Sequence, residues 1–380
     1  MFSDIRRAKA HEILAFPAGE GAAQRMRRAA DEGLGYTAFA VRHLPYKLIF
    51  VKRRIIMNNN TQKPRILAVV GSTASGKTSL AVELAKQFAG EIVSCDSMQI
   101  YRGMNIGTAT PDEAERQGIP HHLMDFVDPT DPAGYSCADY VRDARAAVSD
   151  ILERGKLPIL CGGTGLYLDA FLRGGSFEVT DSDPGLRVEL CALAEREGNQ
   201  ALHDRLRELD PESAEAIHPN NVKRVARAIE ICMTTGRKKS DLDRESREPE
   251  SPYDATVIGL HYDDRGILYD RIDRRVDIMM EQGLLDETRR LREMGVFEIC
   301  RTAAQAIGYK ELFPYLDGEA TLEACVETLK LATHHYAKRQ VTWFKAKPYV
   351  EWITCDTVED GAPIVKKFED IVNNAKTLFP

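Results

Sequence analysis

The segment GSTASGKT at residues 71–78 constrains the fold of this chain more than any other. It matches the pattern GxxxxGK[ST]. It lies between a short apolar run, RILAVVG at 65–71, and a stretch at 77–90 in which apolar residues recur every four positions. A buried strand, a turn containing glycine and a helix N-terminus, in this order, make a nest of backbone amides that binds phosphate. The segment therefore predicts a phosphate-binding loop and leaves the phosphate compound open; the alternative is a chance match in a turn rich in Gly and Ser.

Two side chains of this loop have predictable roles. Lys77 places a positive charge on the bound phosphates, and the hydroxyl of Thr78 is placed to bind Mg²⁺. The phosphate-binding residues predicted from the motif are Gly71, Ser72, Thr73, Ala74, Ser75, Gly76, Lys77 and Thr78.

The rest of the chain predicts an α/β fold. Further strand-like runs are EIVSC at 91–95, KLPILC at 156–161 and ATVIGLHY at 255–262. Strands that alternate with helices form a parallel sheet with right-handed crossovers, and ligands gather at the carboxyl ends of its strands. We therefore expect a P-loop NTPase-like parallel sheet flanked by helices, with an inserted helical subdomain and a mostly helical C-terminal part.

The expected organisation has five segments. They are an N-terminal extension, a phosphate-loop core, a helical insert, a continuation of the core and a C-terminal tail, at 1–56, 57–175, 176–217, 218–355 and 356–380. The first segment holds 11 Lys and Arg against five Asp and Glu and lacks the apolar region of a secretory signal. Met57 begins a polar lead-in to the first strand, so we expect it to be the true start, with the upstream residues disordered or a gene-model artefact.

The charge and the cysteine content limit which cell compartments and which partners are possible. The eight cysteines are scattered without a CxxC pair, which argues against a zinc cluster or a disulfide framework and favours a reducing cytoplasm. The sequence contains no run of about 18 apolar residues, the length that a membrane-spanning helix needs. The net charge is −7, and because residues 1–56 contribute +6, the remainder carries −13. An RNA partner would therefore need a local basic surface.

Two basic segments could provide such a surface. Residues 330–347, KLATHHYAKRQVTWFKAK, hold five Lys and Arg, no acid, and the aromatic residues Tyr336, Trp343 and Phe344. Cations for phosphates and aromatic faces for bases are typical of RNA binding; the alternative is a solvated helix with a buried Trp. Residues 218–230, HPNNVKRVARAIE, hold a second and weaker cluster, because basic helix faces are common.

Charged residues near the loop suggest chemistry. A nucleotide hydrolase of this kind has an acid at the end of a second strand, but KLPILC runs into GGTGLY and offers none. Asp96, after the strand at 91–95, could hold metal-bound water or act as a general base, or it could simply cap a turn. Arg271 and Arg275 lie one helical turn apart and could clamp a diphosphate, although pairing with Asp270, Asp273 or Asp277 is the favoured alternative. His121 and His122 make no metal set and are interpreted as structural or substrate-lining.

Eight segments, taken together and in order over residues 65–347, resemble tRNA dimethylallyltransferases (tRNA isopentenyltransferases) of the bacterial type. They are GSTASGKTSLA, IVSCDSMQIYRGMNIGTATP, GIPHHLMDFVDP, PILCGGTGLYLDAF, IHPNNVKRVARAIE, LYDRIDRRVDIMMEQGLLDE, QAIGYKE and AKRQVTWFK. Two departures are small: Ser72 stands where the family usually has Pro, and Asn105 where it often has Asp.

The resemblance implies a ligand for the loop and an acceptor. The loop would hold the diphosphate of dimethylallyl diphosphate, with Mg²⁺ as the cofactor. The acceptor would be the exocyclic amine of the adenosine 3′ of the anticodon in tRNAs that read codons beginning with U. The catalytic residues would be Asp96, Thr164, Lys77 and Arg275, and Arg271 would join Arg275 on the diphosphate.

The resemblance also implies which residues contact the tRNA anticodon stem-loop, in an enzyme expected to be a cytoplasmic monomer. They are Asp96, Ser97, Met98, Gln99, Thr164, Arg187, Lys223, Arg224, Val225, Ala226, Arg227, Gln305, Gly308, Tyr309, Lys310, Lys338, Arg339, Gln340, Trp343 and Lys345. Two rival interpretations stay open: a small-molecule kinase that uses the loop for ATP, and a non-catalytic RNA-binding protein with a relic loop.

Overall fold

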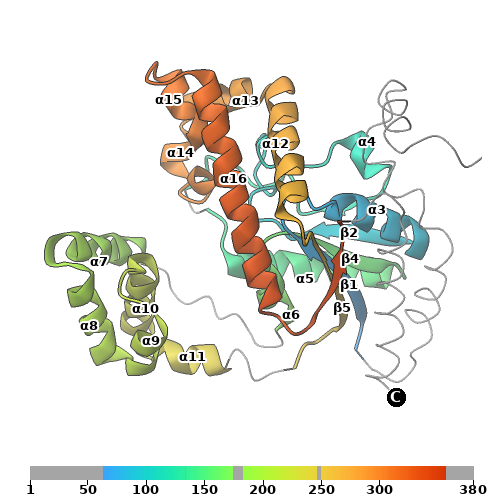
Figure 1. Ribbon diagram of the computed structural model, residues 1–380. Helices are drawn as coiled ribbons and strands as arrows, with labels where there is room; N and C mark the ends of the chain where they lie inside the picture. The colour runs from blue at the N-terminus through green and yellow to red at the C-terminus, as the bar shows by residue number, and fades with distance from the viewer. Residues whose placement is uncertain (1–62, 133, 174–182, 246–249, 357–380) are drawn as a thin grey trace, which may run out of the picture.

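The computed structural model describes residues 63–132, 134–173, 183–245 and 250–356. The expected extension at 1–56 and the tail from residue 357 lie outside the described residues. Six parallel strands form one sheet in the order β3-β2-β4-β1-β5-β6, with helices on both faces (Figure 1). The predicted α/β class is confirmed.

The centre of the sheet is β1, which pairs with β4 on one side and β5 on the other. Almost every residue of β1 is buried, as expected for a parallel strand covered on both faces. The strands span Arg65–Gly71 (β1), Gly90–Ser94 (β2), His121–His122 (β3), Leu157–Gly162 (β4), Asp254–His261 (β5) and Val350–Thr354 (β6). The edge strands β3 and β6 were not predicted from the sequence.

Apolar side chains pack on each face of the sheet. On one face α3, α12 and α16 contribute Leu84, Ile272 and Ala337 to a buried cluster with alternate strand residues. On the other face α5 and α6 contribute Tyr140 and Phe171. These helices span Lys77–Phe88 (α3), Cys137–Glu153 (α5), Gly165–Leu172 (α6), Arg265–Glu281 (α12) and Leu322–Lys345 (α16).

A third cluster joins the long loop after β2 to the helices above the sheet. The buried carboxylate of Glu287 accepts hydrogen bonds from the backbone N–H groups of Ile106 and Gly107, at 3.1 and 3.0 Å, and from the Tyr309 hydroxyl at 2.9 Å. This fixes the loop against that layer. Its short elements span Glu113–Arg116 (α4), Leu284–Glu293 (α13), Val296–Ile299 (α14), Ala303–Gln305 (η1), Lys310–Leu312 (η2) and Phe313–Leu316 (α15).

Five helices between α6 and β5 form a separate body, here named the helical arm (Figure 1). They span Pro184–Glu197 (α7), Asn199–Leu209 (α8), Pro211–Ala216 (α9), Val222–Thr235 (α10) and Lys239–Glu245 (α11). Helices α7 to α10 bury one another around their own apolar cluster. The fully buried Asp210 accepts hydrogen bonds from the hydroxyls of Ser213 and Ser240, at 2.6 and 2.8 Å, which ties α11 to this body. Helix α10 lies beyond the predicted boundary at residue 217 but packs within the arm.

Candidate active site

The phosphate loop runs from the end of β1 into the first turn of α3. Gly76, the residue before the helix, has φ of 92°, a left-handed conformation that glycine adopts without a Cβ clash. The first amides of α3 therefore face the loop, where they have no partner within the helix. Lys77 Nζ donates to the carbonyl of Ser72 at 3.2 Å, so this side chain curls back over the loop.

Two hydroxyls in the loop are buried without a partner. Among the described residues, Oγ of Ser72 and Oγ of Ser75 have no hydrogen-bond partner. Buried polar atoms are normally hydrogen-bonded, so such atoms need an explanation. An oxyanion held in the loop would supply acceptors for both.

Three cations lie in the loop or near it, and each donates a hydrogen bond to a backbone carbonyl. Arg271 Nε contacts the carbonyl of Ala74 at 2.8 Å, Arg275 Nη2 contacts that of Ala109 at 3.4 Å, and Lys77 contacts Ser72. Burial lowers the pKa of Lys77 and of Arg275, and neighbouring positive charge lowers each further. A bound anion would offset both effects.

The alternative pairing expected for these arginines does not hold for two of the three acids. Asp273 accepts a hydrogen bond from His334 at 2.7 Å, and Asp277 pairs with Lys330 at 2.8 Å. Both acids therefore face α16, whereas Arg271 and Arg275 reach the side of α12 that faces the loops. The guanidinium of Arg271 also lies 5.7 Å from the centroid of the Tyr262 ring.

Asp96 and Thr164 lie at the carboxyl ends of neighbouring strands. The Thr164 hydroxyl accepts a hydrogen bond from the N–H of Ser97 at 3.0 Å, and its own N–H donates to the carbonyl of Cys95 at 3.1 Å. Asp96 Oδ1 accepts from the N–H of Met98 at 2.9 Å. Oδ2 of Asp96 has no hydrogen bond from the described residues, so one carboxylate oxygen is available to a substrate proton.

A narrow pocket joins the predicted residues to others. Its lining includes the predicted Lys77, Thr78, Asp96 and Gln99, together with Ile92, His121, Met124, Cys161 and Gly162. His121 Nδ1 lies 2.8 Å from the carbonyl of Ile119, which leaves Nε2 without a partner among the described residues. The Gln99 side chain is held by two hydrogen bonds within the protein. Its oxygen accepts one from the Ser94 hydroxyl at 3.0 Å, and its nitrogen donates one to the carbonyl of Ala109 at 3.2 Å.

Tyr336 is a site residue that sequence reasoning treated only as a stacking aromatic. Burial and the nearby charge of Asp96 raise the pKa of its hydroxyl. Its ring lies under the guanidinium of Arg339, 5.6 Å from the centroid. The spacing of Tyr336 and Gln340, four residues apart on α16, was the signal in the sequence, because such residues share one helix face.

Several residues predicted to contact tRNA face inward. Val225 and Ala226 are fully buried in the helical arm, and Tyr309 is fully buried against Glu287. Gln340 is 5% exposed and contacts the phosphate loop. Trp343 is partly buried against α6, where a Cβ added to Gly165 would come within 2.1 Å of its ring.

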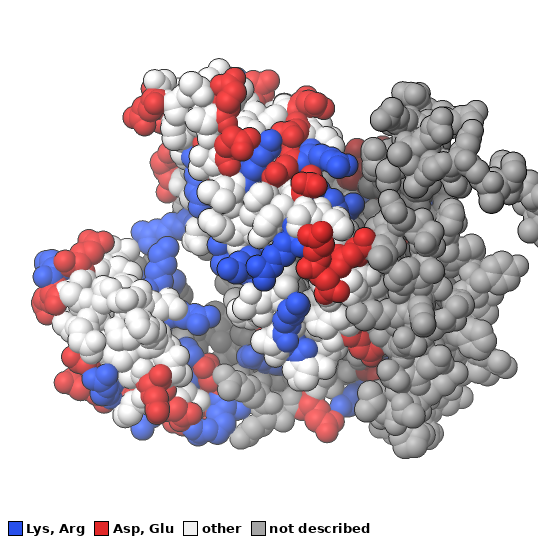
Figure 2. Space-filling model, viewed as in Figure 1, with Lys and Arg blue, Asp and Glu red and all other residues white. Residues whose placement is uncertain are grey.

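Other predicted residues are exposed. They are Lys223, Arg224, Gln305, Lys310, Lys338, Arg339 and Lys345. Arg187 and Arg227 are partly exposed, and both pair with the buried Glu230, at 2.7 and 2.8 Å. Figure 2 shows Lys and Arg side chains around the hollow between the helical arm and the rest of the molecule. The outer side of the arm and the top of the molecule carry more Asp and Glu in the same view.

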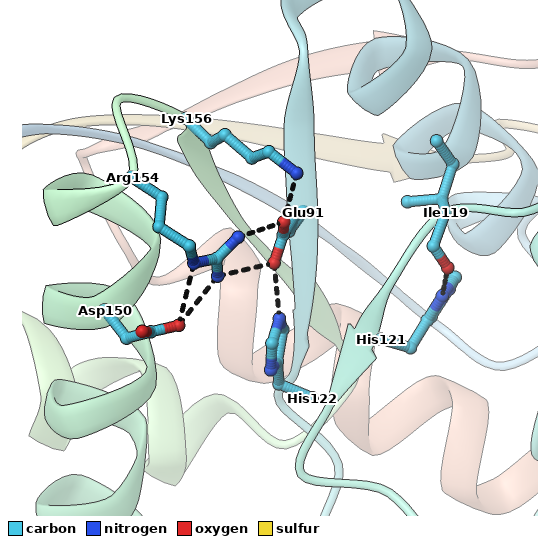
Figure 3. Close-up of polar contacts among 7 residues, drawn as sticks. All are labelled: Glu91, Ile119, His121, His122, Asp150, Arg154 and Lys156. Atoms are coloured by element: carbon cyan, nitrogen blue, oxygen red, sulfur yellow. Dashed lines mark hydrogen bonds and ion pairs between the residues drawn. The ribbon is translucent and has the colours of Figure 1, made fainter.

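A charged cluster lies beside the pocket, at the sheet edge. Glu91 of β2 is 2% exposed, and both of its oxygens bind Arg154, while Lys156 and His122 contact it at 2.6 and 2.7 Å (Figure 3). Hydrogen bonds from Arg154 hold the pKa of Glu91 well below its usual value, against the opposing effect of burial. The cluster holds β3 on β2, and β3 carries His121 into the pocket.

Within the described residues, none of the helices combines the length and apolar character needed to span a membrane.

Two family models match the chain. The model described as "IPP transferase" matches residues 99–347, and the one described as "Isopentenyl transferase" matches residues 64–131. A tRNA dimethylallyltransferase of Bacillus subtilis is 49% identical over 294 residues, which are 77% of this chain and 91% of that protein. A tRNA dimethylallyltransferase of Halalkalibacterium halodurans is 47% identical over 304 residues, which are 80% of this chain and 95% of that protein.

Solved structures agree with these matches. The crystal structure of the full-length tRNA isopentenylpyrophosphate transferase from Bacillus halodurans is 44% identical, with a TM-score of 0.59 over 83% of this chain and 99% of that one. A eukaryotic dimethylallyltransferase acting on tRNA is 31% identical, with a TM-score of 0.70 over 83% and 80% of the two chains.

Proposed function

The chain belongs to the IPP transferase family, and we propose that it transfers the dimethylallyl group of dimethylallyl diphosphate to a tRNA adenosine. The acceptor is the exocyclic amine of the adenosine 3′ of the anticodon in tRNAs that read codons beginning with U, and diphosphate is released. One observation carries this proposal: Arg271 contacts the phosphate loop, Arg275 lies near enough to Lys77 to lower its pKa, and Asp96 lines the same pocket as Lys77.

In the proposed mechanism Asp96 is the general base. The amine nitrogen attacks the allylic carbon, the carbon–oxygen bond to the diphosphate breaks, and the amine proton passes to the Asp96 carboxylate. The Thr164 hydroxyl, held by Ser97, orients the amine. The leaving diphosphate gains negative charge, which Lys77, Arg275 and the loop amides stabilise in a partly dry pocket.

Mg²⁺ fits this loop. The described residues contain no cluster of three or more His, Cys, Asp or Glu that could hold a metal. Mg²⁺ bound to a phosphate substrate needs few protein ligands, because phosphate oxygens and water complete its shell. The hydroxyl of Thr78 would hold the ion, which would neutralise part of the diphosphate charge.

The exposed basic residues on the helical arm and on α16 would grip the anticodon stem-loop. Lys223 and Arg224 lie on the arm, and Lys338, Arg339 and Lys345 lie on α16. These cations would bind backbone phosphates while the target base enters the pocket from the stack. The free thiols of all eight cysteines support a cytoplasmic enzyme, and we propose that it acts as a monomer.

The test is transfer of a labelled dimethylallyl group from its diphosphate to unmodified tRNA, with Mg²⁺, in the presence and absence of ATP. We expect label in the tRNA without ATP, and none in a tRNA whose target adenosine is replaced by guanosine. Absence of transfer, with ATP-dependent phosphorylation of a small molecule instead, would show that the loop belongs to a kinase.

A further inference from the structure

Gln340 joins two loops that the sequence places far apart. Its side-chain oxygen accepts a hydrogen bond from the N–H of Thr73 in the phosphate loop, at 2.8 Å. Its side-chain nitrogen donates to the carbonyl of Gly163, at 3.1 Å. An N–H can only donate and a carbonyl can only accept, so the two partners fix the orientation of the amide. Both ends of this side chain are therefore used inside the protein.

The contact to Gly163 requires close approach. A Cβ added at this glycine would lie 2.0 Å from the Gln340 nitrogen, so any larger residue would displace the Gln340 amide. The residue that follows is Thr164, which holds the Ser97 N–H beside Asp96. Gln340 thus connects the loop that would hold the diphosphate to the loop that would orient the amine.

Residues next to Gln340 on α16 face outward. Lys338 and Arg339 are exposed, and the Arg339 guanidinium lies over the ring of Tyr336. Tyr336 lies one turn before Gln340, partly buried, with Asp96 near enough to raise its pKa. The Tyr336 hydroxyl also interacts with the side chain of Gln340, so interactions run from the exposed Arg339, through Tyr336 and Gln340, to the backbone of the phosphate loop.

We propose that Gln340 is a positioning residue through which RNA bound on the outer side of α16 strengthens the binding of dimethylallyl diphosphate in the phosphate loop. The proposal rests on the proposed function, since it requires both ligands. RNA phosphates that hold Arg339 order the turn from Tyr336 to Gln340, and Gln340 then fixes the Thr73 backbone in the conformation that binds the diphosphate. By linkage, the diphosphate strengthens RNA binding by the same factor.

The experiment measures this factor in the full-length protein. Isothermal titration with dimethylallyl thiolodiphosphate, a poorly reactive analogue, gives its Kd with Mg²⁺ in the absence of RNA and with a saturating unmodified anticodon stem-loop. For wild type we expect RNA to lower the Kd of the analogue about 5- to 150-fold. The ratio of interest is the Kd of the analogue without RNA divided by its Kd with RNA. Gln340→Met keeps the side-chain length and removes both hydrogen bonds, so we expect its ratio to lie within about twofold of one.

A second Gln340 variant and a control variant complete the test. Gln340→Glu keeps the acceptor for Thr73 and removes the donor to Gly163, so its ratio should fall below that of wild type even if Gln340→Met does not fold. Lys345→Ala is the matched control on the same helix: it should weaken RNA binding yet leave the ratio at saturating RNA unchanged.

The outcomes separate this inference from the proposed function. If wild type binds neither RNA nor the analogue, the proposed function fails. If wild type binds both with a ratio near one, or if both Gln340 variants retain the wild-type ratio, the function stands and the role of Gln340 is overturned.

Discussion

The hydroxyl of Thr164 and the backbone N–H of Ser97 are joined by a 3.0 Å hydrogen bond between loops that follow different strands of the sheet. A second contact, 3.3 Å between the two side-chain oxygens, supports the first. The bond holds the segment that carries Asp96 at a fixed place beside the phosphate loop. Thr164 is therefore both a candidate partner for the substrate amine and a support for the segment that carries the proposed base, Asp96.

Replacement of Thr164 by Val should slow catalysis while leaving the fold intact. Val has the same shape but offers no acceptor to Ser97, and an unsatisfied N–H costs about 1–3 kcal/mol, equivalent to roughly 5- to 150-fold in rate. Thr164→Ser keeps the hydroxyl and should stay within about threefold of wild type. Single-turnover transfer to tRNA measures both, and equal rates for Val and wild type would remove Thr164 from the mechanism.

Replacement of Asp96 tests the general base. Asp96→Asn should lower the transfer rate by about 10²–10⁴-fold, because the amide cannot accept the proton. Binding of the diphosphate analogue should change little. An Asp96→Ala variant whose rate lies within about tenfold of wild type would show that Asp96 is not the base.

The arginines on α12 offer a test with a built-in control. Arg275→Gln should lower the transfer rate by about 10²–10³-fold, since it removes one preorganised donor to the leaving group. Its neighbour Arg274 is exposed, and Arg274→Gln should behave as wild type. Similar reductions in both variants would indicate a general effect on α12 rather than a contact with the diphosphate.

Salt dependence tests the basic face of the helical arm. Removal of one cation that binds an RNA phosphate should reduce the slope of log K against log salt by about 0.7–0.9. Lys223→Ala and Arg224→Ala should each lower the slope by about this amount and weaken tRNA binding. Arg207, an exposed arginine of α8 that pairs with Asp204, is the control, and its replacement by Ala should leave the slope unchanged.

The Glu91 cluster predicts how stability depends on pH. Because the pKa of Glu91 is depressed in the folded state, its contribution is present above the ordinary pKa near 4.5 and declines as the pH falls below it. Arg154 and Lys156 are 38% and 41% exposed and can rehydrate, so Glu91→Gln should cost roughly 1–3 kcal/mol at pH 7.

Urea unfolding of wild type and Glu91→Gln at a series of pH values measures this contribution. The difference in free energy of unfolding should narrow as the pH falls below the unfolded-state pKa of Glu91, near 4.5. A difference that grows as the pH falls below about 4.5 would contradict the assigned charge state of Glu91.

The sequence predicted the elements whose pattern is local. The phosphate loop and its flanking strand and helix were predictable, because glycines, a lysine and apolar periodicity carry the information within a short stretch of chain. The strand β3 was not, since two residues hold no periodicity and His121 and His122 are ordinary loop residues by composition. The strand β6 was missed because its charged and aromatic residues do not alternate clearly between polar and apolar.

The sequence also did not predict the direction in which individual side chains point. A run such as VKRVAR contains outward cations and inward apolar residues, and only the packing of α10 against α7 and α8 shows that Val225 and Ala226 are buried. Gln340 is similar, since nothing in AKRQ distinguishes a residue that contacts RNA from one that contacts the phosphate loop. The positions of such residues depend on long-range contacts that a single sequence does not encode locally.

The helical arm has its own apolar core, and this has an evolutionary consequence. Its helices bury Leu202, Leu206 and Ile229 against one another, in a cluster separate from the three clusters of the rest of the molecule. Mutations there can alter the arm without repacking the catalytic fold. In the proposed function the arm grips RNA, so selection could adjust which RNAs are held, and how firmly, independently of the prenyl chemistry.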